Sequence, residues 1–519
     1  MRALCCTNMP NPELPLPVRK HLLDAGVSTE APFTRRVFTN RDLAFDSMKA
    51  VGFDMDYTLG IYNQPALEAL SIEIGVEKLI RRGYPTRLET IQADPEFAVR
   101  GLVVDKEYGN ILKMDRHGYV GRAYHGRKLL PRPERKDIYR AQRVGQERER
   151  FARVDTLFAL PEVTLFAALV EMVEDHPDDW SRTPPSYTQI WTDVREAIDE
   201  SHRDETIKSR IKDQPAAYFH KDPDLAPTLH KLRSAGKKLF LLTNSYYAYT
   251  QVVMGHLLND QMAIYDDWSR YFDWVVVGSQ KPSFFVANRP FLEVDRRTQA
   301  HVGKPRDEPQ KGKVYEAGNR EGLERALGVH SDEILYVGDH IYGDIVTSKK
   351  TASWRTVLVV EDLEQELEVQ RAHELSLREI EALAEIRNEI TEQLFAEKHK
   401  LRVLERLGGE VADEDGAGEE TVQAAARGTL GDVRARLDRL QQHRDELEAV
   451  LQRRTATVDQ AYNRYWGSIF AERLNTSLYG AQVEGYACLY TSRVSNFLYV
   501  SPSRYFHAPA ARMPHRGRA

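Results

Sequence analysis

Two aspartates separated by one residue follow a short apolar segment near the start of the chain. In "MKAVGFDMDYTLG", residues 48–60, Asp54 and Asp56 come directly after the apolar residues. A pair of this kind on its own is more often a turn or a helix cap than a catalytic site. Its chemistry therefore depends on which other side chains the fold brings beside it.

Three further segments carry polar side chains directly after an apolar run. "LFLLTNS" contains Thr243 and Asn244, "VVVGSQKP" contains Lys281, and "ILYVGDHIYGD" contains Asp339 and Asp344. If each run is a strand of one parallel sheet, the carboxyl ends lie at one edge, where open α/β sheets bind ligands. The four segments are therefore expected to meet in one site.

The expected site combines four carboxylates, one lysine and two small hydrogen-bonding side chains. Clustered carboxylates repel one another and need a cation, and ligation by oxygen alone favours Mg²⁺. A lysine beside such a cation suits a phosphate group as the shared anion. One carboxylate can attack phosphorus to form an aspartyl-phosphate, while the acid two residues away protonates the leaving oxygen and later activates water. The predicted metal ligands are Asp54, Asp56, Asp339 and Asp344.

The segments around these residues alternate between strand and helix patterns. Strand patterns over residues 237–245, 274–285, 333–340 and 354–360 are separated by helix patterns. This alternation predicts an α/β fold, with a doubly wound parallel sheet covered on both faces. A mostly helical stretch interrupts it and is predicted to be an inserted segment over the sheet, and residues 101–126 resemble β-hairpins with turns at "EYGN" and "DRHG".

Two stretches near the C-terminus have leucine and isoleucine at helical spacing. They cover residues 361–407 and 421–465, on either side of the acidic loop "GGEVADEDGAGEE". We expect a C-terminal helical hairpin, whose apolar stripe either forms an oligomer contact or packs within its own domain. The predicted domains are an N-terminal arm (1–35), a catalytic core (36–155 and 236–360), a cap (156–235), the hairpin (361–465) and a C-terminal segment packing on the core (466–519).

The composition is that of an ordinary globular protein. The 519 residues include 72 basic and 78 acidic ones, and the net charge of −6 is too mild to predict binding to nucleic acid or to a membrane surface. No apolar run approaches the roughly 20 residues needed to span a bilayer. Cys5, Cys6 and Cys488 cannot form a disulfide framework, and we expect a cytoplasmic protein.

The motifs "FDMDYTLG", "LLTNS", the lysine of "KP" and "GDHIYGDI" resemble those of the haloacid dehalogenase (HAD) phosphohydrolase superfamily. Further stretches, among them "RGLVVDKEYGNILKMDRHG", "TLFALPE" and "DVREAID", are similar to the cytosolic purine 5′-nucleotidases of the HAD-IG type. This resemblance covers nearly the whole chain. It implies a HAD-type doubly wound parallel sheet with an inserted mostly helical cap and a C-terminal helical hairpin.

The resemblance also implies a role for each motif residue. Asp54 would be the nucleophile and a Mg²⁺ ligand, and Asp56 the general acid and base, with its backbone carbonyl on the metal. Thr243 and Asn244 would bind the phosphoryl oxygens, and Lys281 would offset the charge of the nucleophile and the phosphate.

The remaining implied roles concern the metal and the substrate. Asp339 would bind Mg²⁺ directly, and Asp344 would lie nearby, acting through water. Recognition of the base, the sugar and the approaching phosphate would fall to Phe158, Arg195, Asp199, His202 and Lys208.

The implied function is a Mg²⁺-dependent 5′-nucleotidase acting on IMP or GMP, in a homo-oligomer that is a dimer or a tetramer. The chain departs from the family at Ala159 and Arg203, which concern the base, and at Asp155, which concerns an effector site. A HAD phosphatase for another phosphomonoester and an interaction scaffold that keeps the motifs remain alternatives. Without the resemblance, Phe158 would be read as a core aromatic, and Arg195 as the partner of Asp199 in a surface ion pair.

Overall fold

The computed structural model describes residues 31–91, 94–140, 144, 149–181, 183–346, 348, 352–411 and 419–509. Most of the predicted N-terminal arm and the centre of the predicted acidic loop lie outside these ranges. The chain divides into two compact units, Met1–Leu367 with Ile469–Ala519, and Glu368–Ser468. All predicted site residues belong to the first unit.

A ten-stranded sheet forms the centre of the first unit. Four neighbouring strands run parallel in the order β16 (Ile334–Gly338), β3 (Ala50–Phe53), β11 (Lys238–Leu242) and β12 (Trp274–Val277). Beyond β16 lie β17 (Arg355–Val359), β20 (Leu489–Thr491) and β1 (Phe38–Thr39), and beyond β12 lie β15 (Val314–Ala317), β13 (Phe291–Val294) and β14 (His301–Arg306). The predicted α/β fold is confirmed, and the C-terminal segment adds β20 to its sheet.

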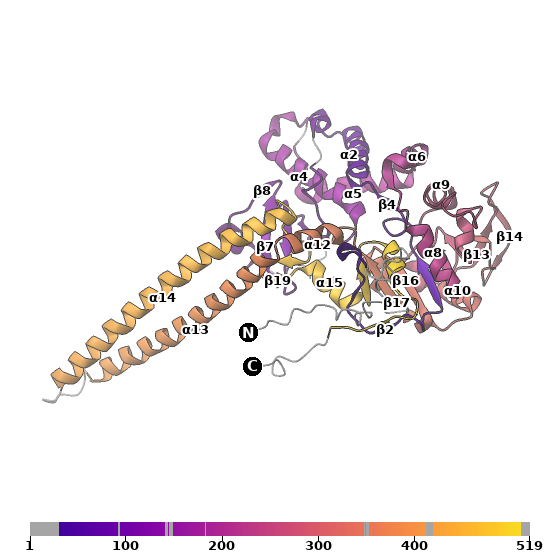
Figure 1. Ribbon diagram of the computed structural model, residues 1–519. Helices are drawn as coiled ribbons and strands as arrows, with labels where there is room; N and C mark the ends of the chain where they lie inside the picture. The colour runs from indigo at the N-terminus through magenta and orange to yellow at the C-terminus, as the bar shows by residue number, and fades with distance from the viewer. Residues whose placement is uncertain are drawn as a thin grey trace. The chain divides into compact units, whose positions relative to one another are not determined.

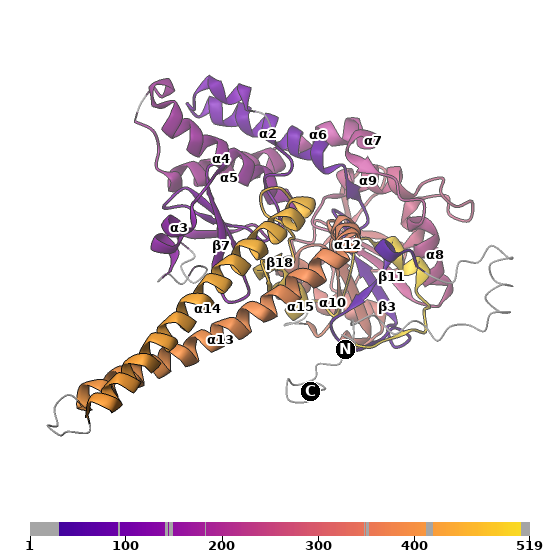
Figure 2. The same ribbon diagram turned by 60° about the vertical axis from the view of Figure 1, so that its left-hand side comes forward.

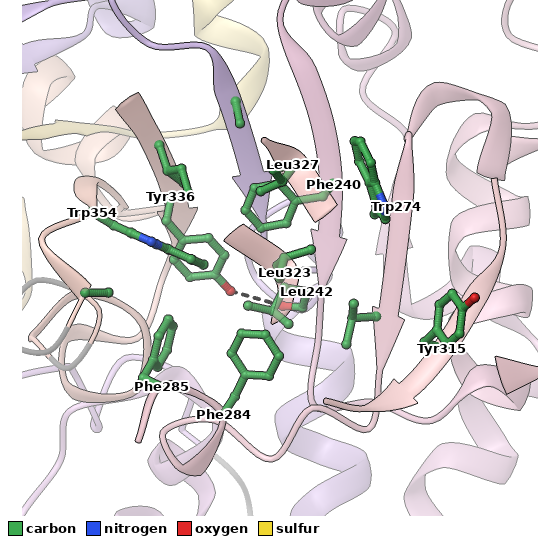
Figure 3. Close-up of a cluster of buried hydrophobic side chains, with 14 of the residues drawn as sticks. Phe240, Leu242, Trp274, Phe284, Phe285, Tyr315, Leu323, Leu327, Tyr336 and Trp354 are labelled. Carbon is green, nitrogen blue, oxygen red and sulfur yellow. Dashed lines mark hydrogen bonds between the residues drawn. The ribbon is translucent and has the colours of Figure 1, made fainter. Parts of the chain in front are cut away.

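An aromatic cluster covers one part of this sheet (Figure 3). Phe240, Tyr336 and Trp354 are almost completely buried there, and the Tyr336 and Trp354 ring centroids are 5.6 Å apart. A Cβ atom on Gly52 would lie 2.1 Å from the Phe240 ring, so glycine is needed for β3 to lie this close. The Tyr336 hydroxyl donates to the Leu242 carbonyl at 3.0 Å, which satisfies a polar group inside the cluster.

Helices α2 (Gln64–Arg81), α4 (Leu160–Asp175), α5 (Tyr187–Arg203) and α6 (Thr206–Asp213) form a helical layer (Figures 1 and 2). The predicted catalytic core includes residues 64–81, but the helix α2 that they form packs against α4 and α5. A Cβ atom on Gly75 of α2 would lie 2.9 Å from Leu165 and 3.0 Å from Ile198, so α2 lies close to both helices. Conversely, α8 (Leu225–Ser234), which lies within the range predicted as the cap, packs against β11 of the core.

The predicted β-hairpins belong to a five-stranded sheet in the order β8-β7-β6-β5-β9. Gly109 and Gly118 adopt φ angles of +67° and +82°, which allow the two tight turns. The strands are β5 (Val103–Asp105), β6 (Asn110–Met114), β7 (Val120–His125), β8 (Lys128–Leu129) and β9 (Phe151–Arg153), with α3 (Arg132–Tyr139) following β8.

A two-stranded ribbon connects the core with the helical layer. The chain leaves the core through β4 (Ile61–Tyr62), which pairs with β10 (Phe219–His220) on the returning side. The remaining elements of the first unit include α7 (Pro215–Tyr218), α9 (Tyr247–Leu258), α10 (Arg320–Leu327), α15 (Leu478–Tyr486) and the strands β2 (Leu43–Ala44), β18 (Ala471–Glu472), β19 (Asn475–Thr476) and β21 (Tyr505–Phe506).

The second unit consists mainly of two long helices, α13 (Glu374–Val411) and α14 (Glu419–Tyr462), which lie side by side (Figure 1). Much of the predicted apolar stripe packs between them, as in the cluster of Leu394 with Val433 and Leu437. Ile386 is an exception, because it is 46% exposed. The first predicted helix is also divided, since a separate α12 (Leu363–Ala372) buries Leu363 and Leu367 in the first unit. The homo-oligomer stays a prediction.

No helix within the described ranges combines the length and the apolar character needed to cross a membrane.

Candidate active site

The carboxyl ends of four neighbouring strands bring the predicted motif residues together. Asp54 follows β3 directly, and its backbone N–H donates to the Val337 carbonyl of β16 at 2.9 Å. Asp339 follows β16, and one carboxylate oxygen each from Asp54, Asp339 and Asp344 lies within 4.8 Å of the others. Three acids from two strand ends therefore share one small volume.

Lys281 lies between two of these acids. Its Nζ is 3.0 Å from Asp54 Oδ1 and 2.7 Å from Asp344 Oδ1, and its side chain is only 3% exposed. It also donates to the Tyr336 hydroxyl at 2.7 Å, which links the site to the aromatic cluster. Asn244 Oδ1 accepts from the Lys281 backbone N–H at 2.6 Å and so holds the loop that carries the lysine.

Thr243 and Asn244 follow β11 on the side of the site opposite to β16. Thr243 is fully buried, and its hydroxyl accepts from the Ser245 backbone N–H at 3.2 Å. The Asn244 side chain is hydrogen-bonded to the Lys281 loop on both its oxygen and its nitrogen. The contact of these two residues with phosphoryl oxygens stays a prediction.

The acidic group is held at an electrostatic cost. Burial, together with the charges of Asp344 and Asp56, raises the pKa of Asp54 above its usual range, although Lys281 opposes the rise. Burial and the charges of Asp344 and Asp54 raise the pKa of Asp339, although Arg100 and Lys281 oppose the rise. Three largely buried oxygen donors with excess negative charge fit a small divalent cation such as Mg²⁺.

Asp56 is held through both of its carboxylate oxygens. The Tyr62 hydroxyl donates to Oδ1 at 2.6 Å, and the Ser245 hydroxyl donates to Oδ2 at 2.8 Å. The Tyr62 oxygen is itself 2.8 Å from the Tyr249 hydroxyl. The second acid of the motif therefore has a fixed orientation, while the first faces Lys281.

A cleft of about 310 Å³ opens beside Asp56. Its lining includes four of the five predicted substrate residues, namely Phe158, Asp199, His202 and Lys208. Phe158 packs edge-on against His202, with ring centroids 5.7 Å apart, and burial lowers the pKa of that histidine.

Arg195 is not among the residues that line this cleft. Its Nε is 3.7 Å from Glu162 Oε2, and its side chain is 55% exposed. The sequence alone indicated an ion pair between Arg195 and Asp199 on one helix face. In the structure, Arg195 pairs with Glu162 of α4. Its predicted contact with substrate stays a prediction.

Several residues of the site were not singled out from the sequence. Ser245 stands next to Asn244 in the "TNS" motif, so its position could have indicated it. Arg100 begins the stretch "RGLVVDKEYGNILKMDRHG" that carries the resemblance, but no role was assigned to it. Its side chain is 1% exposed, it pairs with Asp362, and it opposes the negative charge of Asp339. Tyr62 and Tyr249 likewise carry no motif that distinguishes them from core tyrosines.

Comparisons with known proteins find relatives that are named for a 5′-nucleotidase domain. The chain is 27% identical over 470 residues to a 5′-nucleotidase domain-containing protein of Dictyostelium discoideum, covering 89% of this chain and 71% of that protein. It is 28% identical over 351 residues to 5′-nucleotidase domain-containing protein 2 of Rattus norvegicus, covering 64% of this chain and 60% of the relative. The alignment thus spans less than two thirds of the rat protein.

Among solved structures, a HAD phosphatase from Thermococcus onnurineus is 17% identical and covers 60% of this chain and 87% of its own, with a TM-score of 0.23. Because this TM-score is low, the assignment of the fold rests on the strand order described above. The model of the 5′ nucleotidase family matches residues 37–518. The match takes in the acids of β3 and β16, the Lys281 loop and the helical layer, so the chain belongs to the 5′ nucleotidase family of phosphomonoester hydrolases.

Proposed function

We propose that the chain is a Mg²⁺-dependent 5′-nucleotidase that converts a nucleoside 5′-monophosphate, with IMP or GMP expected, into nucleoside and phosphate. The observation that carries this proposal is the position of Asp56. It follows Asp54 at the end of β3, and it also lines the cleft together with Phe158 and Lys208. A phosphate beside Asp54 could therefore belong to a substrate whose remaining part fills the cleft.

Asp54 is proposed as the nucleophile. Its Oδ1 faces Lys281 Nζ at 3.0 Å and accepts from the Met55 backbone N–H at 2.8 Å. Among the described residues, no group is hydrogen-bonded to Oδ2, so this oxygen is the one left to act. As it bonds to phosphorus, the bond from phosphorus to the 5′-oxygen breaks, and Lys281 stabilises the negative charge on the transferring group.

Asp56 is proposed to move the proton in both halves of the reaction. It first gives a proton to the departing 5′-oxygen, which leaves as the alcohol of the nucleoside. It then accepts a proton from the water that attacks the aspartyl-phosphate. The bond between phosphorus and Asp54 breaks, which restores the carboxylate of Asp54 and releases inorganic phosphate. The hydrogen bonds from Tyr62 and Ser245 keep the carboxyl group in place for both transfers.

The side chains of Asp54, Asp339 and Asp344 would hold Mg²⁺, with the backbone carbonyl of Asp56 as a further ligand. The ion would neutralise the oxygens of the phosphoryl group and so let an anionic nucleophile approach it. A Cβ atom on Gly338 would lie 2.6 Å from Asp344 Oδ2, so glycine is needed for that carboxylate to lie against β16.

The cleft supports a substrate with a flat, partly apolar end. Phe158 is half-buried, with its ring 4.7 Å from that of Tyr57, and a purine base could stack on it. Asp199, His202 and Lys208 offer hydrogen bonds and charge for the sugar and the phosphate. The departures at Ala159 and Arg203 leave the choice of purine to experiment.

Phosphate release from a panel of substrates tests the proposal. IMP, GMP, AMP, UMP, CMP and several sugar phosphates are compared with and without Mg²⁺, for the wild type, Asp54→Asn and the exposed control Asp332→Asn. We expect Mg²⁺-dependent release from IMP or GMP that is lost only in Asp54→Asn. Release from sugar phosphates alone would replace the proposed substrate, and release from none of them would favour the scaffold alternative.

A further inference from the structure

Two tyrosines outside the motifs connect the substrate cleft with Asp56. We propose that Tyr62 and Tyr249 are positioning residues, which fix the Asp56 carboxyl group for proton transfer to the leaving oxygen and tie its orientation to the occupant of the cleft. The inference rests on the proposed function, because it concerns Asp56 as the general acid.

The hydrogen bonds between these groups have a defined direction. The single hydroxyl hydrogen of Tyr62 points at Asp56 Oδ1, 2.6 Å away, because a carboxylate oxygen, or the carbonyl oxygen of the protonated acid, can only accept. In the 2.8 Å contact between the two tyrosine oxygens, Tyr249 must then be the donor. Tyr62 and Tyr249 are only 2% and 3% exposed, so water does not replace these partners. The two hydrogen bonds therefore run in one direction, from Tyr249 to Tyr62 and from Tyr62 to Asp56.

The same two rings contact residues of the cleft. The Tyr62 ring centroid is 5.9 Å from that of Phe158, which lines the cleft where the base is expected. Lys208 Nζ lies over the Tyr249 ring, 5.4 Å from its centroid. A ligand that moves Phe158 or draws Lys208 toward a phosphate therefore acts directly on the rings whose hydroxyls hold Asp56.

The backbone position of Tyr62 strengthens this link. Tyr62 lies in β4 and pairs with Phe219 of β10, in the ribbon where the chain passes between the core and the helical layer. Its ring also packs on that of Phe219, with centroids 4.2 Å apart. Tyr249 belongs to α9, which follows β11 of the core. The hydrogen bond between the tyrosines therefore joins the core to the ribbon at the point where Asp56 is held.

The effect of a misplaced Asp56 should depend on the leaving group. When the bond from phosphorus to the 5′-oxygen of a nucleotide breaks, that oxygen must receive the proton of Asp56, because an alkoxide is a poor leaving group. The p-nitrophenolate ion leaves readily without a proton. A misplaced Asp56 should therefore slow the first half-reaction with a nucleotide much more than with p-nitrophenyl phosphate.

The test compares kcat/KM for the preferred nucleoside monophosphate and for p-nitrophenyl phosphate in Tyr62→Phe and Tyr249→Phe. This ratio reports on steps up to departure of the leaving group. We expect Tyr62→Phe to lose about 10-fold or more with the nucleotide and less than about 3-fold with p-nitrophenyl phosphate. Tyr249→Phe, which only removes the donor to Tyr62, should show the same selectivity with a smaller loss.

Tyr247→Phe is the matched control. Tyr247 is a buried tyrosine of the same helix α9, and its hydroxyl donates to Gln251 at 2.7 Å. Tyr247→Phe should leave kcat/KM unchanged for both substrates. Equal losses with both substrates, or no loss, in a folded Tyr62→Phe would overturn the proposal. If the wild type cleaves another alkyl phosphate in place of nucleotides, the proposed substrate fails, and the same comparison with that phosphate still decides the role of the tyrosines.

Discussion

Glu68 of α2 offers a test of how the helical layer is packed. It is only 1% exposed, and its Oε1 accepts from the Thr164 hydroxyl of α4 at 2.9 Å. Its Oε2 is buried without a hydrogen-bond partner among the described residues. Burial raises the pKa of Glu68 from 4.5 to about 7, although the Thr164 hydrogen bond opposes the rise. The charged form of this side chain is thus disfavoured in the folded protein.

The size and sign of the contribution of Glu68 to the free energy of unfolding follow from this pKa. Because the folded protein holds the proton more tightly than the unfolded chain, the stabilising contribution is complete below pH 4.5 and is lost as pH rises to about 7. A rise of this size corresponds to about 3 kcal/mol in the free energy of unfolding. Glu68→Gln keeps an acceptor for Thr164 but cannot ionise. It should therefore be up to about 3 kcal/mol more stable than the wild type at pH 8 and nearly equal to it at pH 4.5.

Urea unfolding at several pH values from 4.5 to 8, followed by tryptophan fluorescence, measures this difference. Trp191 of α5 is buried in the same layer and packs edge-on against Phe166 of α4, so its signal reports on the layer. Glu73→Gln is the control, because Glu73 is an exposed glutamate of the same helix. A difference between Glu68→Gln and the wild type that stays constant with pH would refute the packing of α2 described here.

Three other changes test the site itself. Lys281→Met leaves the largely buried carboxylates of Asp54 and Asp344 without the cation that pairs with them. In the absence of Mg²⁺ the free energy of unfolding should therefore fall by about 3–5 kcal/mol, and phosphate release should cease. Unchanged urea unfolding would contradict the contacts of Lys281. Mg²⁺ should raise the midpoint of thermal unfolding of the wild type but not of Asp339→Asn, since binding to the folded state stabilises it; an equal rise in both would place the ion elsewhere. Phe158→Ala should raise KM for the preferred nucleotide about 10-fold while leaving KM for p-nitrophenyl phosphate nearly unchanged, because only the nucleotide has a base to stack; an unchanged KM for the nucleotide would argue against stacking.

The strand ends could be predicted from the sequence because each is a local signal. Asp54 and Asp339 come at the end of an apolar run and Lys281 comes a few residues after one, and the geometry of a parallel sheet then places these ends together. The position of α2 could not be predicted in the same way. Its pattern indicates a buried face but not the surface that covers it, and here Gly75 allows it to lie against α4 and α5. Arg100 was missed for a related reason, because a buried arginine distant in sequence from its acids carries no periodic signal.

The point at which the chain enters the helical layer separates the residues that carry out the reaction from those that recognise the base. The helical layer is inserted between Asp56 and Thr243, so the chain leaves the site directly after one motif and returns before the next. Only residues 57–60 separate Asp56 from the ribbon strand β4, and a tether this short transmits small shifts of the ribbon to the acid. The acids of β3 and β16 and the Lys281 loop follow strands of the core sheet. Base preference should therefore change with substitutions at Phe158 and in α5 without loss of the nucleophile, whereas the step that needs Asp56 as an acid should depend on both parts of the fold.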